Sequence, residues 1–315
     1  MITNNKKRVL FVSGGNNDKL LDYVKEQADE INDSTEYSID HYLIKGKGII
    51  GYLKNYIPLR RKLISNNYDF IHAHYGLSGM LAVLQRKCRV IITFHGSDLN
   101  RKDHRKISIL ASYLATKSIV VSEKLKSHLA SNKNNNIHLI PCGVDLSVFK
   151  PIHQNEAKLR LNLNQNDNYI LFGGAKSNKV KNWNLALKAL ENIRYNYKII
   201  ELKNMSREQV NLALNSSSIL LLTSHMEGSP QIIKEAMSTN TPIVVTNVGD
   251  VEWLLHNVTN TYIVKHDKNE ISNAINNILS HPTRLSTNGR ERILELKLDK
   301  ESVTKELRFV YHSIE

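Results

Sequence analysis

The sequence predicts an α/β protein made of two Rossmann-like, doubly wound domains that face each other across a central cleft. Its 315 residues are about twice the usual length of one such domain. Short β-branched runs alternate with longer amphipathic stretches from one end to the other, which is typical of parallel sheets covered by helices. This alternation starts twice, each time with an apolar run that leads into two glycines, Gly14 and Gly15 in the first half and Gly173 and Gly174 in the second.

The first domain is expected over residues 1–150. It opens with the apolar run RVLFVS, and each later strand is again a short β-branched run bounded by polar or glycine residues. The strands expected in this half lie at residues 8–13, 37–44, 70–76, 89–96, 118–122 and 137–143. Residues 150–168 are polar and lack strand periodicity, so the domain boundary belongs there.

The second domain is expected over residues 151–315. Its strands are the β-branched runs at residues 169–175, 197–202, 218–224, 241–247 and 261–265. The tail from 287 to 314 has helical character and apolar residues available for packing, and it can return to the first domain. In doubly wound domains, ligands bind at the carboxyl ends of the strands.

Composition excludes several classes of protein. Hydrophobic residues make up 41% and charged residues 23%, which is far from a disordered or disulfide-rich chain. The two cysteines, Cys88 and Cys142, form no CxxC pair, so a structural zinc site is not expected. So few cysteines fit a reducing compartment, and a cytoplasmic location is expected. The basic start before a short apolar run is read as a first strand, and no transmembrane helix is predicted.

Positive charge is concentrated in the first half. Residues 1–150 hold 23 Lys and Arg against 13 Asp and Glu, so this half carries +10 of the net +13. This asymmetry indicates an anionic partner, such as a lipid surface, a phosphorylated acceptor or nucleic acid, although a solvated basic face fits equally well. Residues 45–65 mix basic with apolar side chains, which is typical of a membrane-surface helix or of an ordinary helix interrupted by Pro58. A second basic run spans residues 101–106.

The stretch from 218 to 254 carries the most chemistry. A buried strand is expected to end at Ser224, and a helix to begin after Gly228 with Ser229 as N-cap and Pro230 at the first helical position. Such a helix start favours a phosphate, while Glu227 and Glu235 can accept hydrogen bonds from sugar hydroxyls. A phosphate beside a polyol is the signature of a nucleotide sugar.

This stretch resembles the C-terminal motif of family 4 retaining glycosyltransferases, which have the GT-B fold. The matching residues are Glu-Gly-x-Pro, then Glu-Ala-Met, then Thr-Pro-Ile-Val-Val-Thr-x-x-Gly, with seven residues between the two glutamates. The resemblance implies that Glu227 lies near the donor sugar and Glu235 contacts the nucleotide ribose. It also implies that the backbone amides of Gly228 and Ser229 lie near sugar or phosphate.

The resemblance extends through YDFIHAHYGLSG, RVIITFHGSDL, SIVVSEKLKSHL and HLIPCGVDLSVFKP, and so covers most of the chain. It implies that His95 faces the cleft as a catalytic residue, near the reacting carbon or the leaving phosphate of the donor. The residues alone favour a loop histidine hydrogen-bonded to Asp98. His72 and His74 point to the same side of a strand, where packing or cleft-lining roles are favoured over metal binding.

The chain departs from the family where the donor diphosphate is bound. The family usually has Gly-Arg and, several residues later, Lys-Gly; here Lys181 matches the lysine, Asn182 replaces the glycine, and Ala175 stands in place of the arginine. The neighbouring Lys176 can substitute as a point charge, and Gly174 precedes both. The resemblance implies a metal-independent reaction without a cofactor, and the residues show no metal motif.

Three further residues are expected at the acceptor side of the cleft. Gly14 and Gly15 let the backbone approach a ligand, although any tight βα turn also requires such glycines, and the full GxGxxG pattern is absent. Asp98 follows His95 in the same loop.

Together these observations predict a retaining glycosyltransferase that moves a sugar from a nucleoside-diphosphate sugar to an acceptor hydroxyl. Residues 1–150 would bind the acceptor and 151–315 the donor, in bacterial surface polysaccharide or glycolipid assembly. The acceptor is expected to be a sugar, a lipid-linked molecule or a glycan, with the protein cytoplasmic or peripheral at the inner membrane face. The alternatives are a non-catalytic nucleotide or nucleic-acid binding protein of the same fold, which no nucleic-acid motif supports, and an epimerase or phosphorylase.

Overall fold

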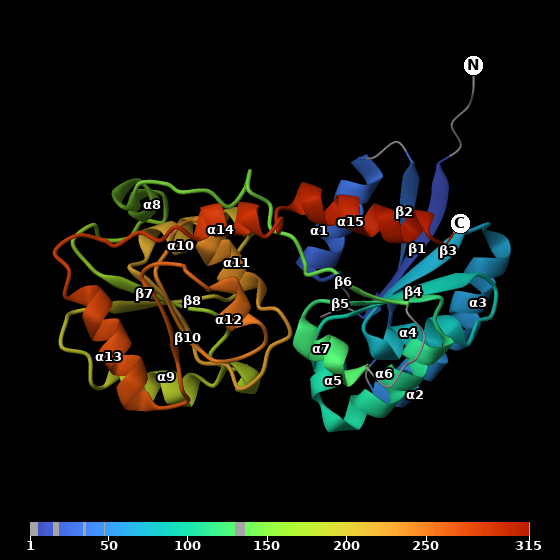
Figure 1. The fold of residues 1–315 in the computed structure, drawn as a ribbon, viewed down its shortest axis with the longest axis horizontal. Helices are drawn as coiled ribbons and strands as arrows, with labels where there is room; N and C mark the ends of the chain where they lie inside the picture. Colours follow the sequence, from blue (N-terminus) through green and yellow to red (C-terminus); the bar gives the residue numbers. More distant parts are fainter. Residues whose placement is uncertain (1–5, 15–18, 34–35, 47, 130–135, 315) are drawn as a thin grey trace, which may run out of the picture. The chain divides into compact units, whose positions relative to one another are not determined.

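The computed structural model describes residues 6–14, 19–33, 36–46, 48–129 and 136–314. It divides into two compact units, coloured along the sequence in Figure 1. Unit 1 comprises Met1–Gly143 with Lys300–Glu315, and unit 2 comprises Val144–Asp299. The chain thus leaves unit 1 at Gly143 and returns to it at Lys300, whereas the sequence places the boundary at residue 150.

Unit 1 is built on a parallel sheet with the strand order β2-β1-β3-β4-β5-β6. Its strands are β1 (Lys7–Gly14), β2 (Tyr37–Ile44), β3 (Phe70–His74), β4 (Arg89–Phe94), β5 (Lys117–Val120) and β6 (Ile137–Leu139). Its helices are α1 (Asp22–Asp33), α2 (Gly48–Lys54), α3 (Tyr56–Ser65), α4 (Gly76–Val83), α5 (Ser97–Asn100), α6 (Lys102–Leu114), α7 (Glu123–His128) and α15 (Lys300–His312). The predicted alternation of strands and helices in this half is confirmed.

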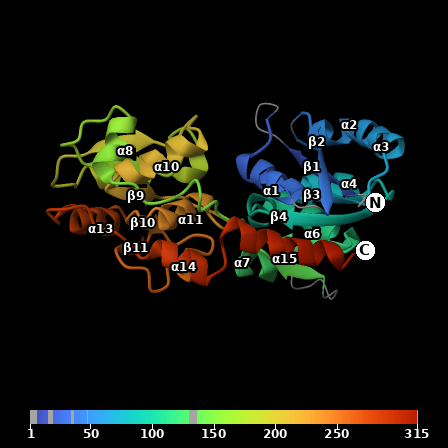
Figure 2. The same cartoon turned by 90° about the horizontal axis from the view of Figure 1, so that it is seen from above.

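Both faces of this sheet are buried, as the continuous apolar runs of its strands require. Along β1, Val9 and Phe11 pack against α1 and α15, while Leu10 and Val12 pack against α3, α4 and α6 on the other face. Figure 2 shows α2 and α3 on one side of the sheet and α15 on the other. Helices therefore cover both faces of the sheet, and ligands can bind only at the ends of the strands.

Helix α15 covers unit 1 although it is the last helix of the chain. Val303, Leu307, Val310 and Tyr311 form its buried stripe, spaced three and four residues apart, and they pack with the apolar residues of α1 and β1. The hydroxyl of Tyr311 lies 2.7 Å from Nδ1 of His72 in β3. Figure 1 shows this red helix beside the blue α1, so the two ends of the sequence complete one layer.

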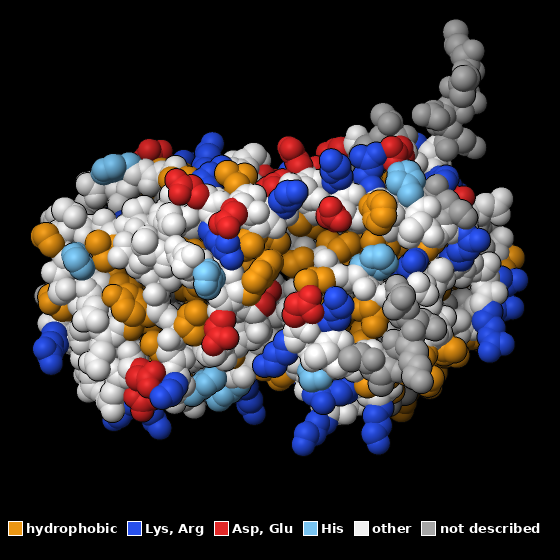
Figure 3. Space-filling model, viewed as in Figure 1, with side chains coloured by type: hydrophobic (Ala, Val, Ile, Leu, Met, Phe, Trp, Pro, Cys, Tyr) orange, Lys and Arg blue, Asp and Glu red, His pale blue; other side chains and the backbone are white. Residues whose placement is uncertain are grey.

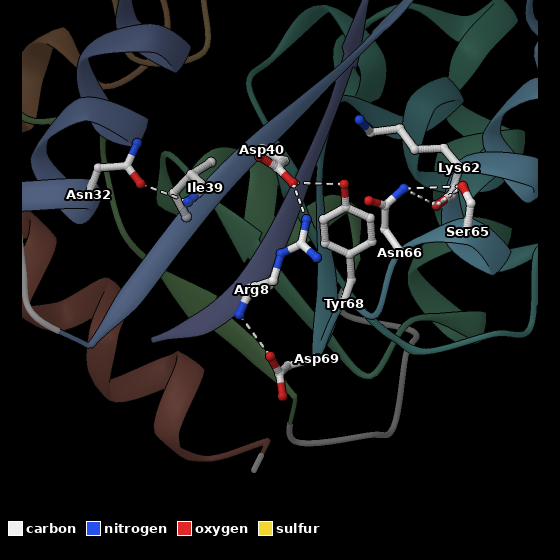
Figure 4. Close-up of polar contacts among 9 residues, drawn as sticks. All are labelled: Arg8, Asn32, Ile39, Asp40, Lys62, Ser65, Asn66, Tyr68 and Asp69. Carbon is white, nitrogen blue, oxygen red and sulfur yellow. Dashed lines mark hydrogen bonds and ion pairs between the residues drawn. The ribbon is translucent and has the colours of Figure 1, made fainter. Parts of the chain in front are cut away.

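A polar cluster joins the amino-terminal ends of the first three strands (Figure 4). Arg8 of β1 donates through Nη2 to Asp40 of β2 at 2.8 Å, and Tyr68 donates to the same carboxylate oxygen at 2.8 Å. The backbone N–H of Arg8 donates to Asp69 at 2.7 Å. Since the amino-terminal edge is used for these structural contacts, the opposite edge is where loops are available for ligands.

Unit 2 is a second parallel sheet, with the strand order β11-β10-β9-β7-β8. Its strands are β7 (Tyr169–Phe172), β8 (Lys198–Glu201), β9 (Ile219–Leu222), β10 (Ile243–Thr246) and β11 (Thr261–Val264). Its helices are α8 (Gln154–Arg160), the 3₁₀ turn η1 (Lys179–Lys181), α9 (Trp183–Leu190), α10 (Arg207–Ser216), α11 (Gln231–Ser238), α12 (Val251–Leu254), α13 (Lys268–Leu279) and α14 (Gly289–Glu295). One apolar core holds residues of α10, α11 and α14, and the other holds residues of α9 and α13.

One helix start differs from the sequence prediction. Helix α11 begins at Gln231, with Pro230 as its N-cap and no side-chain cap hydrogen bond, rather than at Pro230 behind a Ser229 cap. Pro230 has φ −68° and ψ 115°, so its fixed φ fits either position and its extended ψ places it just outside the helix. The loop before α11 therefore includes Ser229 and Pro230.

Removing buried side-chain volume from α15 should destabilise the protein. Leu307 is 1% exposed, and Leu307→Ala should lower the free energy of unfolding by about 2–4 kcal/mol through lost burial and a residual cavity. Phe309 lies in the same helix but is 66% exposed, so Phe309→Ala should change it by less than about 0.5 kcal/mol. Urea unfolding followed by far-UV circular dichroism measures both; equal losses would contradict the packing of α15 described above.

Candidate active site

The central strands of unit 2 place two predicted site residues at one edge of the sheet. From β7 the chain goes to β8 on one side and to β9, β10 and β11 on the other, so the strand order reverses between β7 and β9. In doubly wound sheets this switch point, at the carboxyl ends of the strands, is where loops diverge and ligands bind. Lys181 follows β7 and Glu227 follows β9.

Lys181 and Glu227 form an ion pair at this point. Nζ of Lys181 lies 2.7 Å from Oε1 of Glu227, and the two side chains are only 20% and 16% exposed. The hydroxyl of Ser224 donates to the same carboxylate oxygen at 2.7 Å. A Cβ on Gly174 would lie 2.6 Å from Cγ of Lys181, so glycine leaves the space that the lysine side chain occupies.

The loop that carries Lys181 is held by hydrogen bonds within the loop and from the end of β9. The Asn178 side chain accepts from the backbone N–H of Val180 at 3.0 Å, and the Thr223 hydroxyl contacts the carbonyls of Lys181 and Asn182. Asn182 itself is left-handed, with φ 53° and ψ 52°. Asparagine tolerates this conformation better than most residues other than glycine, which explains how it replaces the glycine of the family pattern.

The second predicted cation, Lys176, lies in a different environment. It is exposed, and its ammonium lies 4.5 Å from the ring centroid of Trp183, a cation–π contact. Its backbone N–H donates to the Glu201 carboxylate at 2.9 Å. The structure therefore pairs Lys181 with Glu227 and stacks Lys176 on an aromatic ring.

The loops after β9 and β10 approach each other closely. Gly249 has φ +63°, and a Cβ there would lie 2.7 Å from the carbonyl oxygen of Gly228. Only glycine combines this backbone conformation with so close an approach. The next residue, Asp250, is thereby brought beside Ser229 and the buried Lys234.

Asp250 was not predicted as a site residue. Burial raises the pKa of its carboxyl to about 6, although the nearby charge of Lys234 and the neighbouring Ser229 hydroxyl act in the opposite direction. Groups with such raised pKa values concentrate at functional sites. The available signal was its position directly after a strand end and a glycine, in the stretch Asn-Val-Gly-Asp.

Glu235 lies on α11 and is almost fully buried. Its carboxylate is 3% exposed and forms an ion pair with Nη2 of Arg207 at 2.8 Å. The guanidinium of Arg207 lies 4.6 Å from the ring centroid of Phe149. Arg207 is thus a partner that the spacing of the two glutamates did not reveal, because it comes from a different helix.

In unit 1, His95 follows β4 and belongs to a row of imidazoles. Its Nε2 lies 3.2 Å from Nδ1 of His74, and its Nδ1 lies 3.8 Å from Sγ of Cys142. The rings of Tyr23 and Tyr75 lie 4.9 and 4.7 Å from the His95 ring, centroid to centroid. His95 is therefore contacted by side chains from α1, from β3 and from two loops.

Asp98 organises the backbone of the same loop. The buried carboxylate accepts hydrogen bonds from the backbone N–H groups of Gly96 at 2.8 Å and of His95 and Gly76 at 3.3 Å. Burial nevertheless raises the pKa of Asp98 to about 6. The contact between His95 and Asp98 expected from the residues alone is thus made through the His95 backbone, and the imidazole meets His74.

His72 and His74 are fully buried and stacked, with ring centroids 4.5 Å apart. His72 uses both ring nitrogens, contacting Tyr311 and Thr93 at 2.7 Å each. Burial lowers the pKa of His72 to about 3, so it is neutral at physiological pH. Within the described residues, no group of three His, Cys, Asp or Glu is arranged to hold a metal ion.

Of the two glycines predicted after β1, Gly14 lies at the carboxyl end of the strand and Gly15 lies outside the described residues. A Cβ on Gly14 would lie 2.7 Å from the hydroxyl of Tyr52 in α2, so the Tyr52 side chain would have to shift if a larger residue stood here. Tyr75, which follows β3, has φ 72° and ψ 151°, a region that non-glycine residues rarely occupy. Such strain is found where surrounding structure fixes a functional loop.

The raised pKa of Asp250 predicts a pH-dependent effect of removing its charge. A carboxyl whose folded pKa is raised contributes stability at low pH that is lost as pH rises through the folded value, here about 6. Wild type therefore loses stability between about pH 4 and about pH 7, whereas Asp250→Asn has no carboxyl to ionise. The unfolding free energy of the variant minus that of wild type should rise by about 2 kcal/mol over this range. Urea unfolding at several pH values measures this, with the exposed Glu191→Gln as a control that should show no such trend. A flat difference for Asp250→Asn would contradict the assignment.

Comparison with known proteins extends this picture across the chain. Residues 17–148 match the family described as Glycosyltransferase Family 4, and residues 94–292 match Glycosyl transferases group 1. An uncharacterised glycosyltransferase of Methanocaldococcus jannaschii is 26% identical, over 94% of this chain and 89% of its own length. The UDP-Gal:alpha-D-GlcNAc-diphosphoundecaprenol alpha-1,3-galactosyltransferase of Escherichia coli is 24% identical, over 79% of this chain and 75% of its own length.

Solved structures share the fold at low sequence identity. Sucrose-phosphate synthase from Thermosynechococcus elongatus superposes with a TM-score of 0.83 and 18% identity, covering 98% of each chain. The HepE protein of Anabaena in complex with UDP superposes with a TM-score of 0.76 and 12% identity, covering 97% of this chain and all of that one. The group 1 match spans more than half of the sequence and includes the loops that carry His95, Lys181, Glu227 and Asp250. The chain therefore belongs to the glycosyl transferases of group 1 and is a family 4 glycosyltransferase with the GT-B fold.

Proposed function

We propose that this glycosyltransferase moves a sugar from a nucleoside-diphosphate sugar to an acceptor hydroxyl, and that unit 2 binds the donor. The ion pair between Lys181 and Glu227 carries the proposal. It combines a cation for the diphosphate with a carboxylate for sugar hydroxyls at the switch point of a doubly wound sheet.

The geometry of the pair supports an exchange of partners on binding. Without a ligand, Lys181 and Glu227 neutralise each other in a largely buried position. When a diphosphate takes the ammonium, Glu227 keeps the hydrogen bond from Ser224 and becomes available to the hydroxyls of the sugar. The same ammonium then stabilises the negative charge that grows on the leaving diphosphate.

The neighbouring groups are assigned supporting roles. The backbone of Gly228 and Ser229 at the start of α11 would contact sugar or phosphate, and Gly174 keeps room for Lys181. Lys176 would meet the diphosphate only by leaving Trp183. Glu235 is proposed to contact the nucleotide ribose. Because its carboxylate is buried and paired with Arg207, the ribose must either reach the carboxylate or form part of the contact with Arg207.

The acceptor side is assigned to unit 1, with His95 as its catalytic residue and Gly14 and Asp98 shaping the surrounding loops. The relatives support the class of substrates: one is named for a UDP-galactose donor and a diphosphoundecaprenol-linked acceptor, and one is solved with UDP. Another is named as a putative teichuronic acid biosynthesis enzyme of Bacillus subtilis. We therefore propose a role in cell-surface polysaccharide or glycolipid assembly, on the cytoplasmic side of the membrane.

We further propose that the reaction retains the anomeric configuration and needs no metal ion. The lysine and the helix start supply the charge stabilisation that a metal would otherwise supply. The leaving phosphate would take the proton of the acceptor hydroxyl on the same face of the sugar.

Donor binding and turnover should separate in variants of the two units. Lys181→Met should weaken binding of UDP, GDP or ADP by about 10–100-fold, because it removes the cation for the diphosphate. His95→Ala should leave that affinity unchanged and lower turnover by about 100-fold or more. Calorimetry with the nucleoside diphosphates and a transfer assay over a panel of their sugars measure both.

Lys179→Met is a matched control, because Lys179 lies in the same 3₁₀ turn but is exposed. It should bind and turn over as wild type does, and Glu227→Gln should lose turnover. If no nucleoside diphosphate binds, or if Lys179→Met weakens binding as much as Lys181→Met, the donor site proposed here is wrong. Binding of nucleotide without transfer to any acceptor would favour a non-catalytic binding protein.

The stereochemical proposal has its own measurement. Proton NMR of the product formed from an α-linked donor should show an α-linkage, and activity should persist in the presence of EDTA because no step needs a metal ion. A β-linked product would contradict retention, and loss of activity that Mg²⁺ restores would contradict metal independence.

A further inference from the structure

Helices α2 and α3 of unit 1 expose large apolar side chains to solvent. Those of Ile50, Leu53, Ile57 and Ile64 are 71%, 58%, 59% and 62% exposed. We call these four residues the α2–α3 stripe. Ile50 and Leu53 lie three residues apart on α2, and Ile57 and Ile64 lie seven residues apart on α3, so each pair shares one face of its own helix. Single exposed apolar residues are ordinary in proteins, but four large ones within 15 residues of sequence require an explanation.

Poor packing does not account for this exposure, because the opposite side of the two helices is well packed. Leu59 and Leu63 belong to the core of unit 1. The buried Asn55 between the helices donates to the carbonyls of Gly51 and Lys45, at 2.7 and 2.8 Å. The helices are thus anchored on one side, and the stripe is a second apolar side without a core to cover it.

All charged residues of the segment that carries the stripe are basic. No Asp or Glu occurs between Asp40 and Asp69, whereas this stretch holds Lys45, Lys47, Lys54, Arg60, Arg61 and Lys62. Lys54 and Arg61 are exposed between the residues of the stripe. Figure 3 shows Lys and Arg side chains and hydrophobic ones at the right-hand margin of the molecule, where Figure 1 places α3.

The end of α4 extends this surface. The guanidinium of Arg60 donates to the carbonyl of Gln85 at 3.1 Å, which holds the end of α4 beside α3. Next to Gln85, Leu84 is 43% exposed, and Arg86 and Lys87 are exposed as well. The apolar stripe is therefore flanked by cations on two neighbouring elements.

We infer that the α2–α3 stripe docks unit 1 on an anionic lipid bilayer. Apolar side chains enter the boundary of the acyl chains while Lys and Arg contact lipid phosphates, and each contribution is weak without the other. The charge argues against a second copy of this chain, because a symmetric contact would bring two basic surfaces together.

The stripe lies next to the predicted acceptor side. On the inward side of α2, Tyr52 places its hydroxyl against Gly14, at the carboxyl end of β1. A bilayer at the stripe would hold a lipid-linked acceptor close to this edge of the sheet, with its lipid remaining in the membrane. This last step rests on the proposed function, whereas bilayer docking does not.

Vesicle sedimentation tests the inference, in the absence of donor and acceptor. Wild type should co-sediment with vesicles of phosphatidylcholine that contain about one third phosphatidylglycerol, and at least about tenfold more weakly with phosphatidylcholine alone. The double variant Leu53→Asp with Ile57→Asp should bind the anionic vesicles at least about tenfold more weakly than wild type, because it replaces two inserting side chains with like-charged repulsion.

A matched control carries the same two charges on unit 2. Leu159 and Leu294 are 58% and 53% exposed, so Leu159→Asp with Leu294→Asp changes net charge and surface polarity equally, and it should bind as wild type does. Equal losses in the two variants, or equal binding of wild type to neutral and anionic vesicles, would overturn the inference. So would a dimer in sedimentation velocity that only the stripe variant dissociates, since the stripe would then be a contact between copies.

This assay also separates the inference from the proposed function. Lys181→Met should lose nucleotide binding and keep vesicle binding, while the stripe variant should do the reverse. Failure of donor binding alone would leave the docking surface in place.

Discussion

Burial of both faces of the two parallel sheets is the constraint from which the rest of this molecule follows. In unit 1, Val9 and Phe11 face one helical layer and Leu10 and Val12 the other, so no side chain within the strand is free for chemistry. Polar function is confined to the strand ends. At the amino-terminal ends of the strands in unit 1, Arg8 contacts Asp40 and Asp69. The candidate catalytic residue His95 follows the carboxyl end of β4.

In unit 2 the same constraint concentrates charge in a small, largely buried volume. Lys181 with Glu227, and Arg207 with Glu235, are ion pairs in which at least one partner is well shielded from water. Pairs of this kind contribute little net stability, because the cost of desolvation offsets the attraction between the charges. Asp250 is costlier still, since its carboxyl is buried and its pKa is raised. This cost to folding supports the donor site proposed above.

Unit 1 uses polar groups differently. Asp98 accepts several backbone N–H groups and so shapes the loop that carries His95, while the buried His74 and the thiol of Cys142 contact the two nitrogens of the imidazole. On its outer surface, exposed isoleucine and leucine alternate with cations along α2 and α3. Part of the positive charge of this half thus lies on the two helices that carry exposed apolar side chains.

Sequence by itself determined the class of fold and the place of the loops that carry Lys181 and Glu227. Strand and helix periodicity, and the glycines after strand ends, are local properties, so the runs that lead to Lys181 and Glu227 could be recognised without coordinates. The contacts that each site side chain makes could not be predicted, because they depend on residues that are distant in the chain. Only the tertiary structure paired Glu235 with Arg207, placed Lys176 on Trp183 and turned the His95 ring toward His74 rather than Asp98. Asp250 was not predicted for the same reason. The pKa of a carboxyl depends on the groups that pack around it, and the whole fold determines which groups these are.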